Sequence, residues 1–481
     1  MKRKFFTNLL LLLGLNLLIK PFWILGIDRT VQNLVGAEDY GTYFALFNFS
    51  VVLNMLLDLG ITNFNNRAIA QHHQLLNKYL SFLVSLKFVL AGFYTLVCLL
   101  IAWLVGYNDR QMYLLYFLIF NQILISVTYY LRSNISGLHH FKTDSVLSVL
   151  DRSLMIIFCS ILLFTNWTGQ RITIEWFVYL QTLAYVLVAA VSLLYVLKYS
   201  GRFKLRFNFR IYKSFLRQSL PFALLVLLHS VYSRIDSVLI ERLLPGTGDV
   251  QAGIYAQAFR LSDAASMFAL MFAGLLLPMF SRMLKQKEDV SQMLLFAFEL
   301  IMVPTLIAVS VSAFYADTIM AALYHNHVAE SALLLTPLMI GFAGIASNYI
   351  FGTLLTANGN LKSLNLIAFS FMALNVAVNS MLIPRYGALA ASRVAMCTQV
   401  GIALAQIVLA WRQFKLQINY LVILKLTGFL LFLLLAGRVS RFTEKPLWGM
   451  VLMAGAGLTY AVAVKLVDVR SLLALLKREQ A

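Results

Sequence analysis

The chain has 481 residues, of which 60% are hydrophobic and 12% are charged, and its formal net charge is +19. A soluble protein of this size carries about 25% charged residues, so the composition excludes a water-facing globular surface and indicates an integral membrane protein. The long continuous apolar runs also exclude a transmembrane β-barrel, whose strands alternate in hydropathy over segments of about ten residues.

The first apolar run follows a basic start, MKRK, and resembles a signal peptide in that respect. Its apolar part is longer than that of a signal peptide, and no cleavage site of small residues follows it. We therefore expect this run to be retained as the first membrane helix.

Fourteen runs approach the length of about 20 apolar residues that a membrane-spanning helix needs. The predicted fold class is therefore all-α, with about 14 transmembrane helices. The predicted spans are 5–27, 41–62, 79–105, 113–131, 145–165, 176–197, 218–240, 252–281, 292–315, 329–356, 364–383, 389–411, 420–437 and 447–464.

The positive charges predict the orientation of these spans. With the N-terminus in the cytoplasm, the cytoplasmic segments hold 24 Lys and Arg residues and the external segments hold 8. Cytoplasmic loops of membrane proteins carry such an excess, so we expect both termini to be cytoplasmic. This asymmetry explains most of the basic net charge, and no nucleic-acid partner is expected.

A weak internal repeat divides the chain into two halves. A Gly-x-Tyr-x3-Phe motif at 41–47 recurs at 253–259, which is 212 residues later. Each half has six spans, an even number, so both halves enter the membrane in the same orientation and predict two pseudo-symmetric six-helix lobes with a cavity between them. The predicted parts are an N-terminal lobe (1–197), a connection (198–217), a C-terminal lobe (218–411), and two extra helices with a tail (412–481).

The connection at 198–217 contains seven basic residues interleaved with aromatic ones. Such a segment at the cytoplasmic surface favours contact with anionic lipid. A plain cluster of charges that stops translocation is the alternative, and the sequence leaves both open.

Basic residues inside apolar runs are the first candidates for a functional site. A charge in the middle of a spanning run costs about 2.5–3.5 kcal/mol on insertion scales, so such residues normally face a protein interior or a wet cavity. Lys20, Arg234 and Arg260 are predicted to lie at a similar depth and to form a cationic lumen suited to phosphate. The alternative is that Arg260 pairs with Asp263 and that Arg234 pairs with a neighbouring carboxylate.

Four intramembrane carboxylates are candidates for coupling to Na⁺ or protons: Asp58, Asp236, Asp263 and Glu299. An alternative role for Asp58 is to cap a helix break at Gly60. We expect no other cofactor and no metal site.

Other residue types give no sign of catalysis or cross-linking. The chain has no glycine-rich phosphate loop, no HExxH motif and no nucleophile elbow. Its three cysteines, Cys98, Cys159 and Cys397, lie in apolar runs and are interpreted as small core residues. We therefore expect a transporter and not an enzyme.

Two stretches carry a resemblance to a known family: VGAEDYGTYFALFNFSVVLNMLLDLGI near the N-terminus, and NVAVNSMLIPRYGALAASRVA at 375–395. They resemble the polysaccharide transport family, which includes the Wzx-type flippases, within the multidrug/oligosaccharidyl-lipid/polysaccharide exporter superfamily. The resemblance covers roughly spans one to twelve. It implies two six-helix lobes, a central cavity and alternating access.

The resemblance also implies a function. The expected substrate is a polyprenyl-(pyro)phosphate-linked oligosaccharide, moved across the bacterial cytoplasmic (inner) membrane for a surface polysaccharide such as the O-antigen of lipopolysaccharide. Other polysaccharide assembly proteins are candidate partners.

Two alternatives remain open. A cation-coupled multidrug exporter of the same superfamily would favour an acidic cavity, whereas the intramembrane residues here comprise more bases than acids. A membrane-embedded glycan transferase or polymerase would need catalytic motifs and longer external loops.

Overall fold

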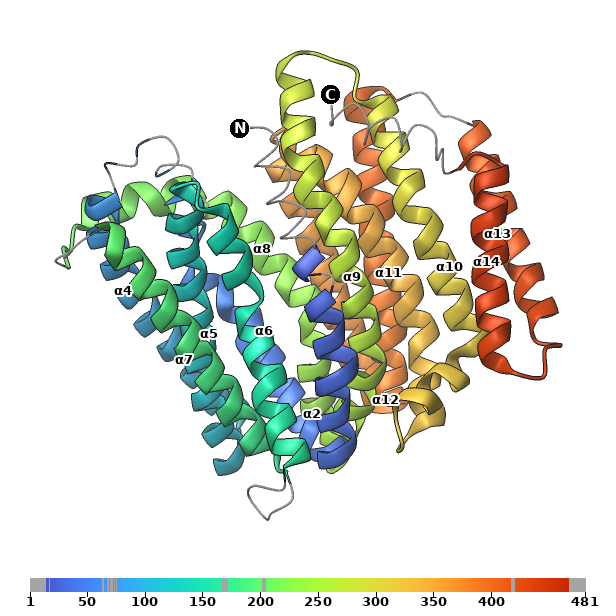
Figure 1. The fold of residues 1–481 in the computed structure, drawn as a ribbon, viewed down its shortest axis with the longest axis horizontal. Helices are drawn as coiled ribbons and strands as arrows, with labels where there is room; N and C mark the ends of the chain where they lie inside the picture. The colour runs from blue at the N-terminus through green and yellow to red at the C-terminus, as the bar shows by residue number, and fades with distance from the viewer. Residues whose placement is uncertain are drawn as a thin grey trace. The chain divides into compact units, whose positions relative to one another are not determined.

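We describe the protein from a computed structural model, which places residues 14–16, 18–62, 65, 66, 69, 72, 74, 76–165, 172–200, 205–416 and 420–466. Every regular element among these residues is helical (Figure 1). Within this described part, 12 helices are long and apolar enough to cross a membrane. The chain is therefore a multi-pass, all-α membrane protein, as its composition predicts.

The elements follow one another along the chain in this order: η1 (Trp23–Asp28), α2 (Arg29–Leu53), η2 (Asn54–Leu57), α4 (Leu76–Val105), α5 (Asp109–Gly137), α6 (Phe141–Phe164), α7 (Ile174–Ser200), α8 (Phe209–Leu243), α9 (Gly248–Lys285), α10 (Ser291–Leu323), α11 (Val328–Ala357), α12 (Leu361–Phe414), α13 (Tyr420–Ser440) and α14 (Pro446–Ala463).

Two glycines reconcile these 12 helices with the 14 predicted spans. One continuous helical span, Gly14–Leu57, covers the first two predictions, and α12 covers the eleventh and twelfth. The first is interrupted at Gly36, with φ 86° and ψ 171°, and α12 at Gly387, with φ 59° and ψ −144°. Only glycine adopts such angles readily. Each glycine therefore separates two of the predicted membrane spans inside what is formally a single helix.

The chain forms two compact units, Met1–Ala256 and Gln257–Ala481. Unit 1 contains α2 to α8 and the first residues of α9, and unit 2 contains the remainder of α9 and the helices that follow. Helix α8, the seventh predicted span, thus groups by its contacts with the six spans that precede it. The lobe boundaries derived from the repeat stay a prediction.

The repeated glycine motif marks a close crossing of two helices inside unit 1. A Cβ atom on Gly41 of α2 would lie 1.8 Å from the carbonyl oxygen of Asp249, and one on Gly253 of α9 would lie 2.0 Å from that of Ala37. The hydroxyl of Thr42 donates a 2.8 Å hydrogen bond to Asp249 across the same contact. Glycine is therefore required in both copies of the motif because the two backbones touch there.

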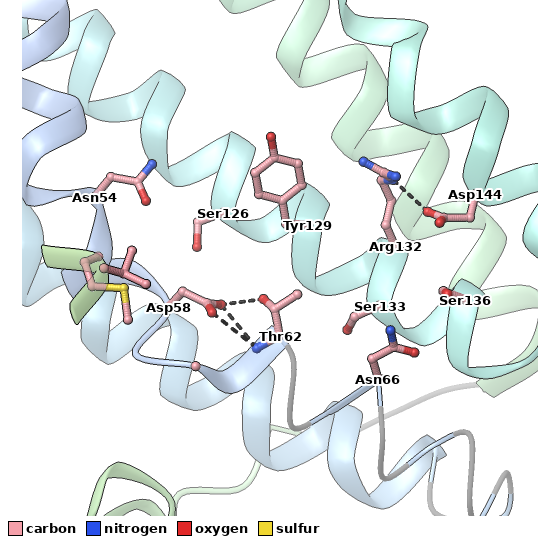
Figure 2. A pocket seen from close by; sticks show the side chains of 13 residues that line it. Asn54, Asp58, Thr62, Asn66, Ser126, Tyr129, Arg132, Ser133, Ser136 and Asp144 are labelled. Atoms are coloured by element: carbon pink, nitrogen blue, oxygen red, sulfur yellow. Dashed lines mark hydrogen bonds and ion pairs between the residues drawn. The ribbon is translucent and has the colours of Figure 1, made fainter. Parts of the chain in front are cut away.

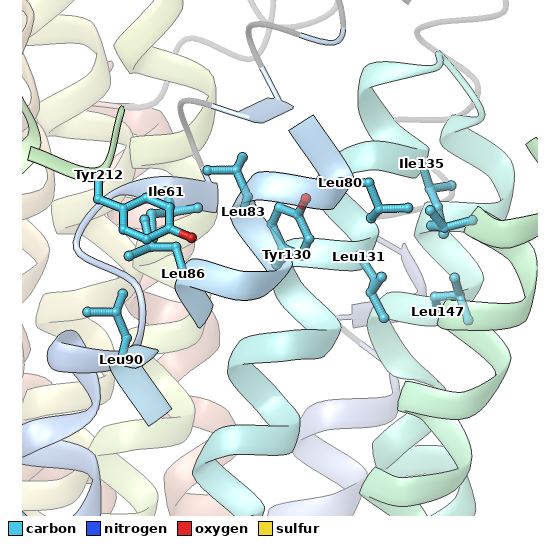
Figure 3. Close-up of a cluster of buried hydrophobic side chains, with 11 residues drawn as sticks. Ile61, Leu80, Leu83, Leu86, Leu90, Tyr130, Leu131, Ile135, Leu147 and Tyr212 are labelled. Atoms are coloured by element: carbon cyan, nitrogen blue, oxygen red, sulfur yellow. The ribbon is translucent and has the colours of Figure 1, made fainter. Parts of the chain in front are cut away.

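One apolar core cluster of unit 1 lies mainly between α4, α5, α6 and α7 (Figure 3). Its buried side chains are Ile61, Leu80, Leu83, Leu86, Leu90, Tyr130, Leu131, Ile135, Leu147, Val196 and Tyr212.

The described part of the connection attaches to this core. Ser85 of α4 donates a 2.6 Å hydrogen bond to the carbonyl of Arg206, and its hydroxyl lies 2.6 Å from that of Tyr212. The backbone N–H of Arg206 donates to the carbonyl of Ser81 at 3.2 Å. Residues 205–212 are thus held against α4, while contact of the 198–217 connection with anionic lipid stays a prediction.

In unit 2, α10 packs against α13 and α14 around an apolar cluster that includes Phe429, Leu433 and Met453. One buried hydrogen bond crosses this contact, from the hydroxyl of Tyr315 to that of Ser440 at 2.7 Å.

The interpretation of the cysteines is correct for two of the three. Cys98 and Cys159 are buried, but Cys397 on α12 is exposed. The prediction that all three are core residues is wrong, because an apolar residue on a membrane helix can face lipid as readily as protein.

Candidate functional site

A break at the end of α2 brings the first polar groups together. After η2 the backbone passes through left-handed conformations at Leu59 (φ 44°) and Gly60 (φ 84°), and the helix resumes at Ile61. The carboxylate of Asp58 accepts hydrogen bonds from the backbone N–H of Thr62, at 3.3 Å to Oδ1, and from its hydroxyl. Asp58 therefore caps the resumed helix, which is the alternative role that the sequence suggested for it.

A buried lysine completes this break. Lys87 of α4 has a 5% exposed side chain, and its Nζ lies 2.5 Å from Oδ1 of Asp58. The same ammonium donates to the carbonyl of Leu57 at 3.0 Å and to the hydroxyl of Ser126 at 2.8 Å. All three donors of the ammonium are thus used. An opposite charge and two hydrogen bonds thus compensate this side chain for the loss of water.

Beside the break lies a polar cavity of about 430 Å³. Figure 2 shows its side chains, which come from η2 and the residues that follow it, from α5 and α6, and from one residue of α8. The lining residues are Asn54, Met55, Asp58, Gly60, Thr62, Asn66, Ser126, Tyr129, Arg132, Ser133, Ser136, Asp144 and Val226.

The charges that line this cavity are paired. Nε of Arg132 lies 2.7 Å from Oδ1 of Asp144, and both side chains are largely buried. Asp58 is paired with Lys87 behind the wall of the cavity. The remaining polar lining consists of amides and hydroxyls, so the cavity presents hydrogen-bonding groups without a net charge. Such a surface suits a neutral polar ligand better than an ion.

A basic cluster continues from the cavity toward the first helix. The charged neighbours of Lys20 are Arg152, Asp151 and Arg132. The guanidinium of Arg152 lies 5.5 Å from the ring centre of Trp23, and its Nε lies 3.6 Å from Oδ2 of Asp151. Arg132 therefore belongs to both the cavity wall and this cluster. Together with Asp144, the partner of Arg132, this cluster has three bases and two carboxylates, so one positive charge is in surplus.

Two buried carboxylates each accept a hydrogen bond from a tyrosine that follows in the chain. Asp28, 1% exposed, accepts from Tyr40 at 2.8 Å. Asp236 of α8, 2% exposed, accepts from Tyr255 of α9 at 3.1 Å. In each half of the chain, an aspartate of the first helix is thus tied to a tyrosine of the second.

The other predicted residue of α8, Arg234, is half-buried and acts electrostatically on His229 and Tyr255. Nδ1 of His229 lies 2.8 Å from the hydroxyl of Tyr232, so this histidine has a local partner.

Unit 2 holds the remaining predicted residues. Arg260 of α9 is 9% exposed, and Asp263 one turn later is half-buried. Glu299 of α10 is half-buried and has Lys425 of α13 as a charged neighbour. Among the described residues, no group of three or more His, Cys, Asp and Glu side chains could hold a metal ion.

A family model described as "Polysaccharide biosynthesis protein" matches residues 8–284, which is more than half of the chain. The chain belongs to this family. No curated protein matches it in sequence.

Solved structures share the fold of this family member. It is similar to the lipid II flippase MurJ in an inward closed conformation, with a TM-score of 0.68 and 13% identity, over 95% of this chain and 98% of that one. It is also similar to an inward-facing multidrug resistance MATE family transporter of the MOP superfamily, with a TM-score of 0.61 and 14% identity, over 82% and 94% of the two chains. A MOP superfamily transporter from Pyrococcus furiosus gives a TM-score of 0.59 at 13% identity, over 85% and 94%.

The family and the fold class predicted from the sequence are thus confirmed. The structure places Lys20 and Arg234 in unit 1 and Arg260 in unit 2, so a lumen shared by all three stays a prediction. Ion coupling by Asp58, Asp236, Asp263 or Glu299 also stays a prediction. The structure shows that Asp58 caps the resumed helix.

Sequence reasoning missed Arg132, Arg152 and Asp28. Arg132 fell in the predicted loop between the spans 113–131 and 145–165. Arg152 was not among the candidate cations, although its guanidinium lies 5.5 Å from the ring centre of Trp23. Asp28 follows the predicted span 5–27 by one residue. The available signal for Arg152 was the dipeptide Asp151–Arg152 itself, a full charge pair within an apolar run.

Proposed function

We propose that this protein is a flippase that moves a polyprenyl-(pyro)phosphate-linked oligosaccharide across the cytoplasmic membrane by alternating access. The observation that carries the proposal is that Arg132 lines the polar cavity and is also one of the charged neighbours of Lys20. A lipid-linked sugar also has two parts, a neutral polyhydroxyl group and an anionic phosphate, joined directly.

In this proposal the phosphate is recognised by charge. Lys20, Arg132 and Arg152 lie together with a surplus of positive charge, and guanidinium groups match phosphate oxygens in a fork geometry. Arg234 and Arg260, the other predicted cations, extend the basic lining of the substrate path as further elements of the proposal.

The sugar is recognised by the cavity of about 430 Å³. Ligand sites of roughly 300–1,000 Å³ are typical of small molecules. Amides such as Asn54 and Asn66 and hydroxyls such as Ser136 both donate and accept hydrogen bonds, as sugar hydroxyls do. The paired charges of Arg132 and Asp144 add directional hydrogen bonding without selecting for an ion.

Export of organic cations is the alternative within the same fold. It would require carboxylates that face the ligand without a basic partner. In the cavity, Asp58 and Asp144 are both paired with bases, and this arrangement favours the anionic lipid-linked substrate.

Coupling to Na⁺ or protons is part of the proposal. Asp236 and its counterpart Asp28 are buried carboxylates that each hold a tyrosine from the next helix, and Asp58, Asp263 and Glu299 are the other candidates. Protonation or ion binding at such a carboxylate would change its hydrogen bond and so link the ion to helix packing.

The proposed setting is the inner membrane of a bacterium, with cytoplasmic termini. A surface polysaccharide such as the O-antigen of lipopolysaccharide is the proposed destination, and its assembly proteins are the proposed partners. The protein would perform no covalent chemistry.

The test removes the phosphate contacts one at a time. Charge-assisted contacts contribute about 1.5–3 kcal/mol, so Arg152→Gln and Lys20→Gln should each lower substrate affinity roughly ten- to hundredfold. Arg152→Lys should retain part of the activity, because it keeps the charge and loses the fork. We expect losses of the same direction for Arg234→Ala and Arg260→Ala. The measurement is the leaflet distribution of lipid-linked oligosaccharide, normalised to folded protein.

Arg393→Gln is the matched control, because Arg393 is an exposed intramembrane arginine of α12. It should transport normally. Normal transport per folded molecule by Arg152→Gln, Lys20→Gln and their double variant would contradict the proposed phosphate site.

A second experiment tests the sugar part. Asn66→Leu and Ser136→Leu replace polar cavity groups with apolar ones. Both should weaken binding of the polyprenyl-pyrophosphate-linked oligosaccharide and leave binding of bare polyprenyl pyrophosphate unchanged. An equal loss of affinity for both ligands would show that the cavity does not bind the sugar.

A further inference from the structure

A kink in α10 creates an unusual contact with the end of α13. Tyr315 interrupts α10 with φ −127° and ψ 24°. At the kink, the carbonyl oxygen of Phe314 accepts a 2.7 Å hydrogen bond from Nη2 of Arg441, and the guanidinium carbon of Arg441 lies 5.4 Å from the ring centre of Phe314. Two contacts with Phe314 therefore hold the guanidinium of Arg441 in place, although the side chain is exposed.

The Phe314 ring is itself fixed in place. A Cβ atom on Gly437 of α13 would lie 2.4 Å from this ring, so the ring lies directly on the α13 backbone. The hydrogen bond between Tyr315 and Ser440 holds the same two helices together one residue further along.

A groove of about 910 Å³ opens beside this contact. Its lining consists of two parts. Leu431, Leu434 and Leu435 form an exposed apolar track along α13, and Arg438, Arg441 and Phe442 follow at its end. The groove is thus apolar along the helix and doubly cationic where the helix ends.

The two arginines have binding capacity left. Within the described part of the chain, neither guanidinium forms an ion pair with a carboxylate. Arg441 donates to Phe314 through Nη2 alone, and a guanidinium carries five N–H donors. Two guanidinium groups one turn apart, without acidic partners, form a site for phosphate oxygens.

We propose that this groove binds an anionic phospholipid. Its phosphate lies against Arg438 and Arg441, and an acyl chain follows Leu431, Leu434 and Leu435. The apolar track selects a lipid over a soluble anion, and the two cations select an anionic headgroup over a zwitterionic one. On the predicted topology, the site faces the outer leaflet. It shares no residue with the proposed translocation site.

The test uses native mass spectrometry of the purified full chain with dioleoylphosphatidylglycerol or dioleoylphosphatidylcholine. The double variant Arg438→Gln/Arg441→Gln should lose at least about tenfold in apparent affinity for phosphatidylglycerol, because charge-assisted contacts to phosphate are removed. Its affinity for phosphatidylcholine should not change. The control is Arg412→Gln/Lys415→Gln, which removes two charges at the end of α12 and should retain the preference.

Two further arms separate the sources of phosphate and guard against misfolding. Leu434→Trp obstructs the apolar track with both arginines present, and it should also weaken phosphatidylglycerol binding. Millimolar inorganic phosphate should not displace the lipid. The proposal is overturned if the double glutamine variant keeps the wild-type preference, if Leu434→Trp binds like wild type, or if inorganic phosphate competes.

Discussion

Two regions of the molecule, one in each unit, bury polarity in opposite ways. In unit 1, a lysine, several aspartates and a row of amides lie between α2, α4, α5 and α8, and a polar cavity opens among them. Where α10, α13 and α14 meet in unit 2, the contact is an apolar cluster, and among the hydrogen bonds described the buried one that crosses it joins Tyr315 to Ser440. Both regions lie in membrane-spanning helices, so the membrane does not explain the difference.

The apolar and the polar contacts differ in their effect on the free energy of folding. Apolar contacts between membrane helices gain only packing, since lipid is as apolar as the partner helix. Polar groups must be satisfied inside the protein or they destabilise it. A region that retains many buried charges is therefore one in which a requirement other than stability acts, and in unit 1 we assign that requirement to the substrate.

The largest expected effect tests the polar region at its centre. Lys87→Met leaves Asp58 with no ammonium partner, and breaking a buried pair from one side costs about 3–5 kcal/mol. Lys87→Met/Asp58→Asn should recover most of this loss, because asparagine keeps an acceptor for Thr62 and removes the unpaired charge. The measurement is the free energy of unfolding in detergent. A single variant as stable as wild type would show that the pair does not hold the α2 break.

An intermediate effect is expected for the tyrosines that hold the buried aspartates. Tyr255→Phe and Tyr40→Phe each delete one hydrogen bond to a carboxylate, and such bonds contribute about 1.5–3 kcal/mol. Tyr116→Phe is the control, because Tyr116 is exposed on α5. If the two buried variants unfold like the control, the carboxylates are satisfied without these tyrosines.

The smallest effect is expected in unit 2. Tyr315→Phe removes the bond to Ser440 between neutral groups, which contributes about 0.5–1.5 kcal/mol. The same unfolding assay applies. A loss larger than that of Lys87→Met would reverse the comparison and place the stabilising polar contacts of the protein in unit 2.

The sequence predicted features that depend on consecutive residues, namely the spans and the repeat. It missed features that depend on contacts between residues far apart in the chain. Hydropathy along the chain was enough for the spans, and the glycine motif was enough to indicate a repeat. The partner of Asp58 is Lys87, 29 residues away on α4. No pattern in either segment predicts that these two residues form a pair. Arg152 could be seen as an intramembrane charge, but its place beside Trp23 follows from the packing of α6 against the first span.

Boundaries set a second limit. Asp28 was left outside the first span because its neighbours become polar there, whereas the helix continues as α2 to the break at Gly36. Hydropathy locates where a helix leaves lipid and not where the helix ends. Of the candidate cations, Lys20 was therefore found and its neighbour Arg132 was not, since Arg132 lies beyond the apolar run on a helix that extends to Gly137.

The crossing of Gly41 and Gly253 has a consequence for the genetics of this protein. In each case the atom that excludes a larger residue is a backbone carbonyl oxygen, of Asp249 or of Ala37. Every amino acid carries that oxygen, so no second mutation at the opposing position can make room for a side chain. A library of single substitutions should be depleted of everything except glycine at two positions 212 residues apart, and a screen for suppressors of a Gly41 mutation should recover none at position 249.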